Sequence, residues 1–182
     1  MSDFLGETTD LLRRTPGVLR ALLSGLPETW GATADTEGGW RPRDVIGHLI
    51  GAEHDNWIPR VTRLLEEGTA KAFDSIDRVA YVGRDEAAGL DELVEELAGL
   101  RDANLARLAE LVTDADLDRK GLHPALGEVT LRQLLASWTV HDLDHIAQIY
   151  AGMAGSRDAE VGPWKVYLGI LLRRDDPAAV AG

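Results

Sequence analysis

Hydrophobic residues recur along the chain at intervals of three and four positions, and sustained alternation of apolar and polar residues is absent. This spacing is typical of helices with one buried face, so the sequence predicts an all-α fold. Four main helices are expected near residues 5–25, 42–67, 86–112 and 131–153, followed by a short C-terminal helix that carries Trp164, Tyr167 and Leu171.

Prolines and capping residues set the expected helix ends. Thr15 and Pro16 suit an N-cap followed by proline in the first turn, which predicts a break or a fresh start inside the first helix. Pro59 lies inside the second helix and removes one backbone hydrogen bond, so a kink is expected there. Thr130 and Gln133 form a capping box that begins the fourth helix.

The connections predict how the helices are arranged. Residues 69–85 have no clear period, and a crossover of that length places two consecutive helices of a bundle parallel. Residues 113–129 are expected to form a loop. The sequence therefore predicts a four-helix bundle with a long crossover between helices 2 and 3, in a single domain spanning residues 1–182.

Composition narrows the function classes. The chain has 182 residues, a formal net charge of −12 and no cysteine. A metal site must then use histidine, carboxylate or water, and the lack of cysteine fits a reducing cytoplasm. We expect a cytoplasmic protein with no membrane partner, because a secretory signal and a span of roughly 20 apolar residues are both missing. The negative charge predicts that nucleic acid is not a partner.

Acidic residues are concentrated in residues 85–120, which hold eleven Asp and Glu against four Arg and Lys. Such a segment is usually the solvated outer face of a helix, and we interpret it in that way.

In the fourth helix, polar residues interrupt a heptad seam of Leu and Trp. Trp138 is followed on that seam by His141, His145 and Gln148. Side chains four positions apart share a helix face, with Cβ atoms about 5–6 Å apart, so the two histidines can bind one metal ion. The alternative is a pair of ordinary packed or surface histidines, because this spacing arises by chance in many helices.

Three other histidines are candidates for a third ligand. His48 lies at the edge of the apolar stripe of the second helix, with Asp44 and Asp55 on the same side. His54 faces about 240° away from His48, so one metal cannot easily bind both. His123 lies in the expected loop, where a solvated or packing role is favoured. Spacing alone favours His48 only slightly.

Three segments carry a resemblance to a known family. GWRPRDVIGHLIGAEHDNWIPR resembles the second-helix motif of the DinB/YfiT-like superfamily, in which a Trp opens the helix and a His follows two turns later. HPALGEVTLRQLLASWTVHDLDHIAQI resembles its fourth-helix motif, which ends in H-x-x-x-H-x-x-Q, and VGPWKVYLGIL is similar to the C-terminal segment of one branch. The resemblance covers nearly the whole chain in the right order.

The resemblance implies a bundle with up-down-down-up connectivity and three histidine ligands for a divalent metal, zinc or nickel. By motif position the ligands are His48, His141 and His145. The resemblance also implies a homodimer formed through helix faces. Two positions depart from the family pattern. Arg41 stands where a capping Ser or Thr is common, and Glu53, the best match to a family acidic residue, faces away from His48 on an ideal helix.

Three neutral histidines leave a metal with at least one open position, which is the pattern of catalytic rather than structural sites. Characterised members of the resembled family include thiol S-transferases and a thiol-dependent isomerase, and many others are named hydrolases. We therefore expect a metal-dependent enzyme acting on a small molecule. A thiol S-transferase that uses a low-molecular-weight thiol is favoured slightly over a hydrolase. The competing hypothesis is a non-enzymatic helical module whose metal is structural or absent.

Candidates for the pocket wall or for ligand orientation are Gln148, Trp57, Trp138 and Asp55. Gln148 lies one turn beyond His145, where it can orient a ligand. A bundle tryptophan is more often a core residue than a pocket residue. Asp142 and Asp144 are expected to point away from the site, on a solvated or interfacial face.

Overall fold

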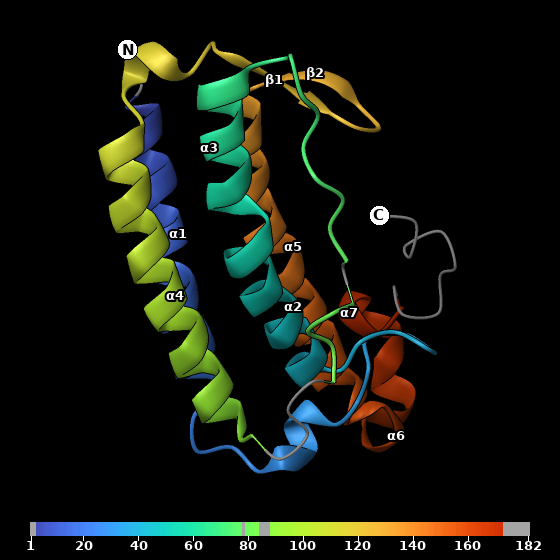
Figure 1. Cartoon of the computed structure of the whole chain (residues 1–182). Helices are drawn as coiled ribbons and strands as arrows, with labels where there is room; N and C mark the ends of the chain where they lie inside the picture. Colours follow the sequence, from blue (N-terminus) through green and yellow to red (C-terminus); the bar gives the residue numbers. More distant parts are fainter. Residues whose placement is uncertain (1–2, 78, 84–87, 173–182) are drawn as a thin grey trace.

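Four long helical rods lie side by side in the computed structural model, which describes residues 3–77, 79–83 and 88–172 (Figure 1). The rods are α1 (Phe4–Leu23), the pair α2 (Pro42–Asp55) and α3 (Trp57–Glu67), α4 (Leu90–Leu111) and α5 (Leu131–Gly155). The α2–α3 rod and α4 run parallel to each other and opposite to α1 and α5 (Figure 1). The predicted up-down-down-up bundle with a long crossover is confirmed.

Short elements occupy the connections and the C-terminal part. They are η1 (Glu28–Gly31), η2 (Asp114–Asp116), α6 (Asp158–Val161), η3 (Gly162–Tyr167) and α7 (Gly169–Leu172). The predicted start of the third helix at Glu86 lies outside the described residues. Within the described part of the chain, none of the helices combines the length and apolar character needed to cross a membrane.

A β-hairpin replaces part of the loop expected over residues 113–129. Strand β1 (Lys120–His123) pairs antiparallel with β2 (Gly127–Thr130). The His123 ring nitrogen Nδ1 accepts hydrogen bonds from two turn N–H groups, each at 3.2 Å. Isolated hairpins are marginally stable, but the backbone N–H of Phe73 in the crossover bonds to Leu122 O at 2.9 Å and supports this one. Strands of four residues are too short to produce a clear alternating pattern.

Pro16 does not interrupt α1, and the predicted break there is wrong. A proline has no N–H for the carbonyl four residues earlier, which here belongs to Leu12. That carbonyl instead accepts a hydrogen bond from Nη1 of Arg101 in α4, at 2.8 Å. The helix continues because a side chain of another helix replaces the lost backbone bond.

Pro59 does interrupt the second rod, and the predicted kink is confirmed. The proline ring would clash with the carbonyl of Asp55, four residues earlier. The α-helix is interrupted at Asn56, whose φ and ψ of −105° and −66° depart from ideal helical values, and α3 begins at the next residue. The break therefore lies one turn before the proline that causes it.

The α2 helix begins without a side-chain cap at Arg41, as the sequence predicts. Asp44 takes over this role. Its Oδ2 atom accepts hydrogen bonds from the backbone N–H of Arg41 at 3.0 Å and from the Nε–H of the Arg41 side chain at 2.7 Å. Burial alone would raise the pKa of Asp44, but the hydrogen bonds and charge of Arg41 outweigh burial and lower it. The start of the helix that carries His48 is fixed in this way.

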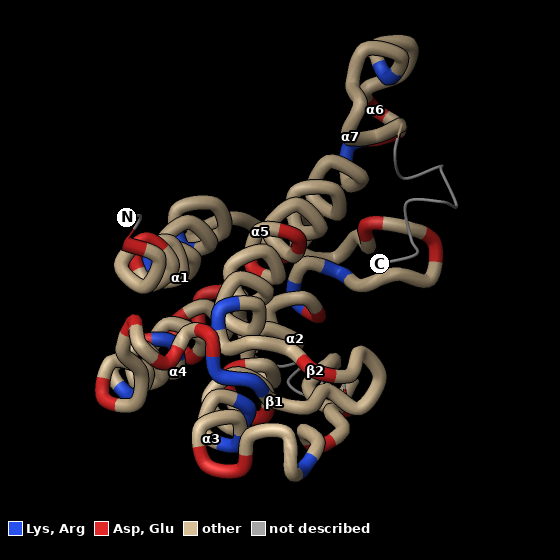
Figure 2. The backbone as a smooth tube through the Cα atoms, turned by 90° about the horizontal axis from the view of Figure 1, so that it is seen from above, with Lys and Arg blue, Asp and Glu red and all other residues tan. Residues whose placement is uncertain are grey.

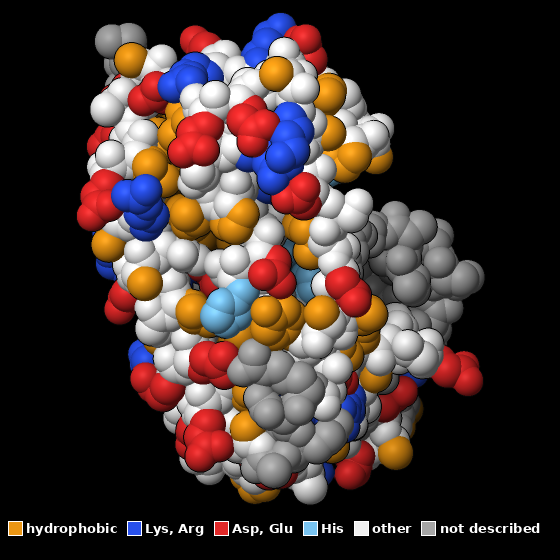
Figure 3. All heavy atoms as spheres, viewed as in Figure 1, with side chains coloured by type: hydrophobic (Ala, Val, Ile, Leu, Met, Phe, Trp, Pro, Cys, Tyr) orange, Lys and Arg blue, Asp and Glu red, His pale blue; other side chains and the backbone are white. Residues whose placement is uncertain are grey.

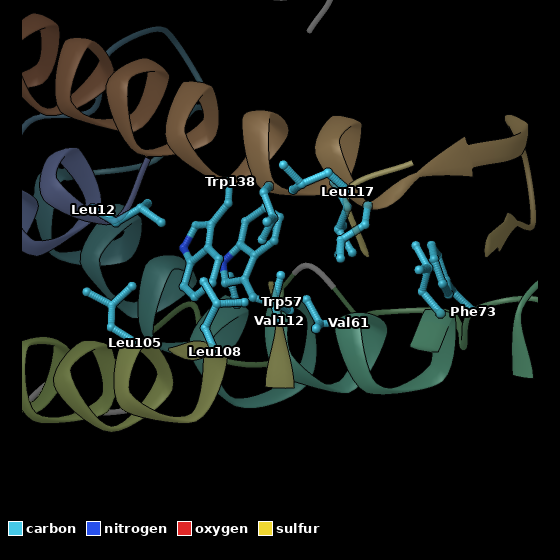
Figure 4. Close-up of a cluster of buried hydrophobic side chains, with 14 residues drawn as sticks. Leu12, Trp57, Val61, Phe73, Leu105, Leu108, Val112, Leu117 and Trp138 are labelled. Carbon is cyan, nitrogen blue, oxygen red and sulfur yellow. The ribbon is translucent and has the colours of Figure 1, made fainter. Parts of the chain in front are cut away.

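Two clusters of buried apolar side chains form the core, one toward each end of the bundle. In the cluster shown in Figure 4, Trp57 of α3 stacks on Trp138 of α5, with ring centroids 5.3 Å apart. Both indoles are almost completely buried, so they are core residues rather than pocket walls.

A buried ion cluster joins all four rods. Arg101 of α4 is 0% exposed and contacts Glu53 of α2 at 2.7 Å and Asp142 of α5 at 2.6 Å, in addition to the Leu12 carbonyl of α1. Asn104 donates to Glu53 Oε2 at 2.9 Å. Asp142 lies on an interfacial face, which is one of the two environments expected for it. The described Asp and Glu residues within 85–120 are exposed or half-buried, as expected for the outer face of a helix, whereas Arg101 of the same segment is buried.

The remaining charges lie mainly on the surface. Figure 2 shows Lys and Arg positions distributed over several elements, with Asp and Glu among them. Exposed pairs such as Arg20–Glu95 and Lys120–Glu128 contribute little to stability, because water and salt screen them. The ion cluster around Arg101 differs from these exposed pairs, since it lies in the interior.

Candidate metal centre

Three histidines from two helices converge between α2 and α5. His48 comes from α2, and His141 and His145 come from successive turns of α5. The Nε2 atom of His141 lies 3.1 Å from that of His48 and 3.2 Å from that of His145. One ligand atom from each residue lies within 4.8 Å of the others. The histidines singled out by the sequence are thus brought together.

The N–H groups of these neutral imidazoles cannot form hydrogen bonds across both short Nε2–Nε2 contacts of His141. His145 Nδ1 lies 2.8 Å from Gln148 Oε1 and donates a hydrogen bond to it. Because the neutral ring has one N–H, His145 Nε2 then carries a lone pair. A single N–H on His141 Nε2 cannot point at both His48 and His145. A cation placed among the three nitrogens would interact favourably with all three lone pairs.

The spacing of the nitrogens also suits a metal ion. Metal–nitrogen bonds of about 2.0–2.1 Å place two ligand nitrogens about 3.0 Å apart at a right angle and about 3.4 Å apart at the tetrahedral angle. The contacts of 3.1 and 3.2 Å around His141 fall between these values. The donor set therefore fits a divalent metal ion.

Burial favours the protonation state that binds a metal. Desolvation lowers the pKa of His145 below its ordinary value, although the Gln148 hydrogen bond and the charges of Asp144, Asp142 and Asp35 oppose the shift. The neutral ring is the form that ligates.

Aromatic rings surround the three imidazoles. Trp40 precedes α2 and lies against His48, with ring centroids 4.8 Å apart, and is stacked 6.3 Å from His145. Trp57 meets the His141 ring edge-on at 5.2 Å. These contacts restrict the rotation of the imidazoles and reduce their contact with water.

The histidines open onto a pocket of ≈ 1350 Å³. Its walls come from α2, α3, α5, the crossover and the hairpin turn, including Tyr81, Asn56, Arg60, His123 and Gln148. In the view of Figure 3, histidine side chains reach the surface next to hydrophobic and acidic side chains. The arrangement gives a small molecule access to the three imidazoles.

Glycines in α2 allow the crossover to approach this pocket. A Cβ on Gly51 would lie 2.5 Å from the ring of Tyr81, and a Cβ on Gly47 would lie 2.5 Å from its carbonyl oxygen. Both distances are shorter than side-chain contacts allow. Tyr81 also stacks on His54, with centroids 5.6 Å apart, and this places His54 outside the histidine cluster.

The other predicted site residues differ in where they lie relative to the pocket. Gln148 both lines the pocket and contacts His145, as expected. Asp55 is exposed and does not line the pocket, because it lies at the end of α2 beside the break. Asp144 is exposed as predicted, but it borders the pocket instead of pointing away. Glu53 faces away from His48, and its role is to pair with Arg101.

Sequence reasoning missed Arg60 and Asn56 as pocket residues, and it assigned Trp40 only to the start of a helix. A signal for the first two exists in the sequence. Asn56 and Arg60 follow His48 at eight and twelve residues, so they lie on the same helix face. The missed role of Trp40 depends on its contact with a second helix, which spacing does not reveal.

Comparisons with known proteins agree with this geometry. A family model described as the DinB superfamily matches residues 11–149. A protein of Bacillus licheniformis is 31% identical over 142 residues, covering 77% of this chain and 80% of the relative. A protein of Geobacillus kaustophilus is also 31% identical, over 141 residues, covering 76% and 78%. Both relatives carry provisional names as metal-dependent hydrolases.

A solved structure shares the fold. YfiT from Bacillus subtilis aligns with a TM-score of 0.71 and 25% sequence identity, covering 82% of this chain and 86% of that one. It is described, again provisionally, as a metal-dependent hydrolase with an unusual four-helix bundle topology. The family resemblance that the sequence motifs predict is confirmed.

Proposed function

Because the chain belongs to the DinB superfamily, we propose that it is a metal-dependent enzyme that acts on a small molecule. In this proposal His48, His141 and His145 bind one divalent ion, zinc or nickel. The observation that carries it is the convergence of three Nε2 atoms at the wall of an open pocket. A structural metal would instead be enclosed by four protein ligands.

We propose hydrolysis as the reaction. The provisional hydrolase names of two relatives and of YfiT support this choice. A metal held by three neutral histidines supplies Lewis acidity, which polarises a substrate carbonyl and makes a water molecule or thiol a better nucleophile. The protein's own residues hold the imidazoles in place: Gln148 fixes the orientation of His145, and Trp40 covers His48.

Thiol transfer is the second candidate, and the size of the pocket favours it. Pockets for one small molecule are usually about 300–1,000 Å³. The volume of ≈ 1350 Å³ leaves room for a low-molecular-weight thiol beside a second substrate. Both reactions use the same three ligands and differ in the nucleophile.

The experiment compares metal-loaded protein with the His145→Ala variant on panels of small esters, amides and electrophiles, with and without added thiol. Metal-dependent product release without thiol supports hydrolysis. Product that forms only with thiol, and contains it, supports transfer. If metal-loaded protein converts no substrate under either condition, the enzyme proposal gives way to a non-enzymatic metal-binding module.

A further inference from the structure

The crossover between α3 and α4 forms one wall of the pocket that contains the three histidines. Its described residues on this wall are Ser75, Ile76, Asp77, Val79 and Tyr81. Ile76 and Val79 are aliphatic, and Tyr81 adds an aromatic ring. The wall therefore presents hydrophobic surface to the same space as the imidazoles.

Tyr81 holds this wall against α2 at the level of His48. Its ring lies over Gly51, where a Cβ would be 2.5 Å from it, and its carbonyl oxygen lies over Gly47, where a Cβ would also be 2.5 Å away. Gly47 precedes His48, and Gly51 follows it by three residues, so both lie within one helical turn of this histidine. The ring also stacks on His54, with centroids 5.6 Å apart. These contacts fix the distance between the crossover and the candidate metal centre.

Hydrogen bonds within the crossover keep Val79 next to Tyr81. The N–H of Val79 donates to Asp77 Oδ1 at 3.0 Å, and its carbonyl oxygen accepts the N–H of Val82 at 3.0 Å. A turn of this kind brings its first and fourth Cα atoms within about 7 Å of each other. Val79 therefore lies near the Tyr81 ring and shares its position beside α2.

The Val79 side chain is 58% exposed although it lines a pocket. A single exposed apolar residue on an open surface needs no explanation, but apolar surface inside a concave site is typical of a place where ligands bind. Further apolar lining comes from Ala52, Pro124, Ala151 and Ile170. The volume of ≈ 1350 Å³ leaves room for a hydrocarbon chain in addition to the atoms at the histidines.

From this arrangement we propose that Ile76, Val79 and Tyr81 form a subsite for an apolar part of the substrate, such as an alkyl chain. The inference rests on the proposed function and refines it. The substrate is then an amphipathic small molecule whose polar group reacts at the histidines while its hydrocarbon part lies against the crossover.

The test uses hydroxamates, which chelate divalent metals, with straight alkyl chains from acetohydroxamate to octanohydroxamate. Calorimetry measures their dissociation constants on metal-loaded protein. Acetohydroxamate has almost no chain, so it reports on the metal centre. A second series of equal length, with ether oxygens in the chain, presents less apolar surface. The readout is the affinity of each probe relative to that of acetohydroxamate on the same protein.

One variant removes apolar surface from the crossover. In Ile76→Ser/Val79→Ser the wall keeps its backbone but loses two aliphatic side chains. The matched control is Val166→Ser/Leu168→Ser, because these residues are 66% and 40% exposed and do not line the pocket.

A second variant displaces the wall without changing its residues. Gly51→Ala adds a Cβ at the place where the Tyr81 ring lies, so the crossover has to shift. Gly99→Ala is its control, since Gly99 is also helical and a Cβ there meets nothing within 4 Å.

On wild-type protein the affinity is expected to rise about two- to fourfold for each added methylene group, because each one that enters the subsite leaves water. The ether series gains less. The relative affinity of octanohydroxamate should fall about tenfold in Ile76→Ser/Val79→Ser, and Gly51→Ala should also lower it. Both control variants should behave like wild type.

An affinity that does not rise along the alkyl series on wild-type protein overturns the apolar subsite, whatever the stability of the variants. A rise that is unchanged in either Ile76→Ser/Val79→Ser or Gly51→Ala also overturns it, because the chain then lies elsewhere. In these cases the binding of acetohydroxamate leaves the proposed metal centre intact. If wild-type protein binds no metal, or no hydroxamate, the proposed function fails and this inference fails with it.

Discussion

At the scale of single residues, the contact between His145 Nδ1 and Gln148 Oε1, at 2.8 Å, fixes which ring nitrogen faces His141. Partners of this kind orient metal ligands, and their loss typically weakens metal binding by about 10–100-fold. Replacing Gln148 by Leu should therefore lower metal affinity by that factor, measured by competition with a chelator. Gln148→Glu keeps an acceptor and should retain most of the affinity. Unchanged affinity in Gln148→Leu would exclude an orienting role.

Arg101 connects all four rods through buried contacts. Burial alone would lower its pKa, but the charges of Asp142 and Glu53 outweigh burial and raise it, so the guanidinium stays charged. Removing one partner of a buried ion pair costs about 3–5 kcal/mol, because the other charge is left without compensation. Arg101→Met should lower the free energy of unfolding by about that amount in urea denaturation.

A matched variant distinguishes the effect of uncompensated buried charges from the effect of lost packing around Arg101. In Arg101→Met combined with Glu53→Gln and Asp142→Asn, the uncompensated charges are absent, and most of the lost stability should return. If the free energy of unfolding of Arg101→Met lies within about 1 kcal/mol of that of wild type, the ion cluster is not what holds the four rods together.

Glu53 makes the contribution of this ion cluster to stability depend on pH. Burial raises the pKa of Glu53 above its ordinary value of 4.5, although Arg101 and Asn104 oppose the shift. The carboxyl group of Glu53 therefore stays protonated to a higher pH in the folded protein than in the unfolded chain. Between the two pKa values the folded state binds more protons, so the contribution of Glu53 to stability falls as pH rises.

The comparison with Glu53→Gln isolates this effect, because glutamine does not titrate. The unfolding free energy of wild type minus that of the variant should fall as pH rises from 4.5 and level off above the raised pKa. Urea titrations at a series of pH values measure the difference. A difference that is constant or rises with pH contradicts the raised pKa.

At the scale of secondary-structure elements, sequence spacing predicts features that depend on one helix. The four-residue interval between His141 and His145 places both on one face, and Pro59 marks the break in the second rod. Features that depend on a second element were not predictable in this way. Asp142 pairs with Arg101 of α4, and Pro16 is tolerated in α1 because Arg101 also supplies a hydrogen bond to the Leu12 carbonyl. No local pattern encodes either contact.

The exposed face of α5 carries apolar residues at heptad spacing. Val140, Leu143, Ala147 and Tyr150 follow at intervals of three, four and three, and Val140 and Leu143 are 62% and 50% exposed. This pattern is typical of a helix that packs against another helix. We expect two copies of the chain to associate through this face.

Sedimentation at micromolar concentration tests the association. Wild-type protein is expected to sediment as a dimer, and the Val140→Glu/Leu143→Glu double variant as a folded monomer, because charges would be buried in the interface. Val18→Glu is the control, since Val18 is an exposed apolar residue on α1. A wild-type protein that stays monomeric, or a dimer that persists in the double variant, contradicts this surface.

At the scale of the whole molecule, the parts that hold the bundle together are separate from the parts that form the site. Both apolar clusters and the ion cluster around Arg101 lie in the interior, whereas the three imidazoles face a pocket at the side of α2 and α5. Loss of a histidine ligand should therefore leave the fold intact. A failure to bind metal can then be assigned to the site itself.

The most direct test of the account is the number of divalent metal ions bound per chain, measured by elemental analysis of purified, folded protein after incubation with zinc or nickel. Wild type, His54→Ala and His123→Ala should bind one ion, because His54 and His123 lie outside the histidine cluster. His145→Ala should lose stoichiometric binding while its circular dichroism stays helical. One tightly bound ion per chain in His145→Ala, with wild-type affinity, would contradict the three-histidine centre and the function proposed from it.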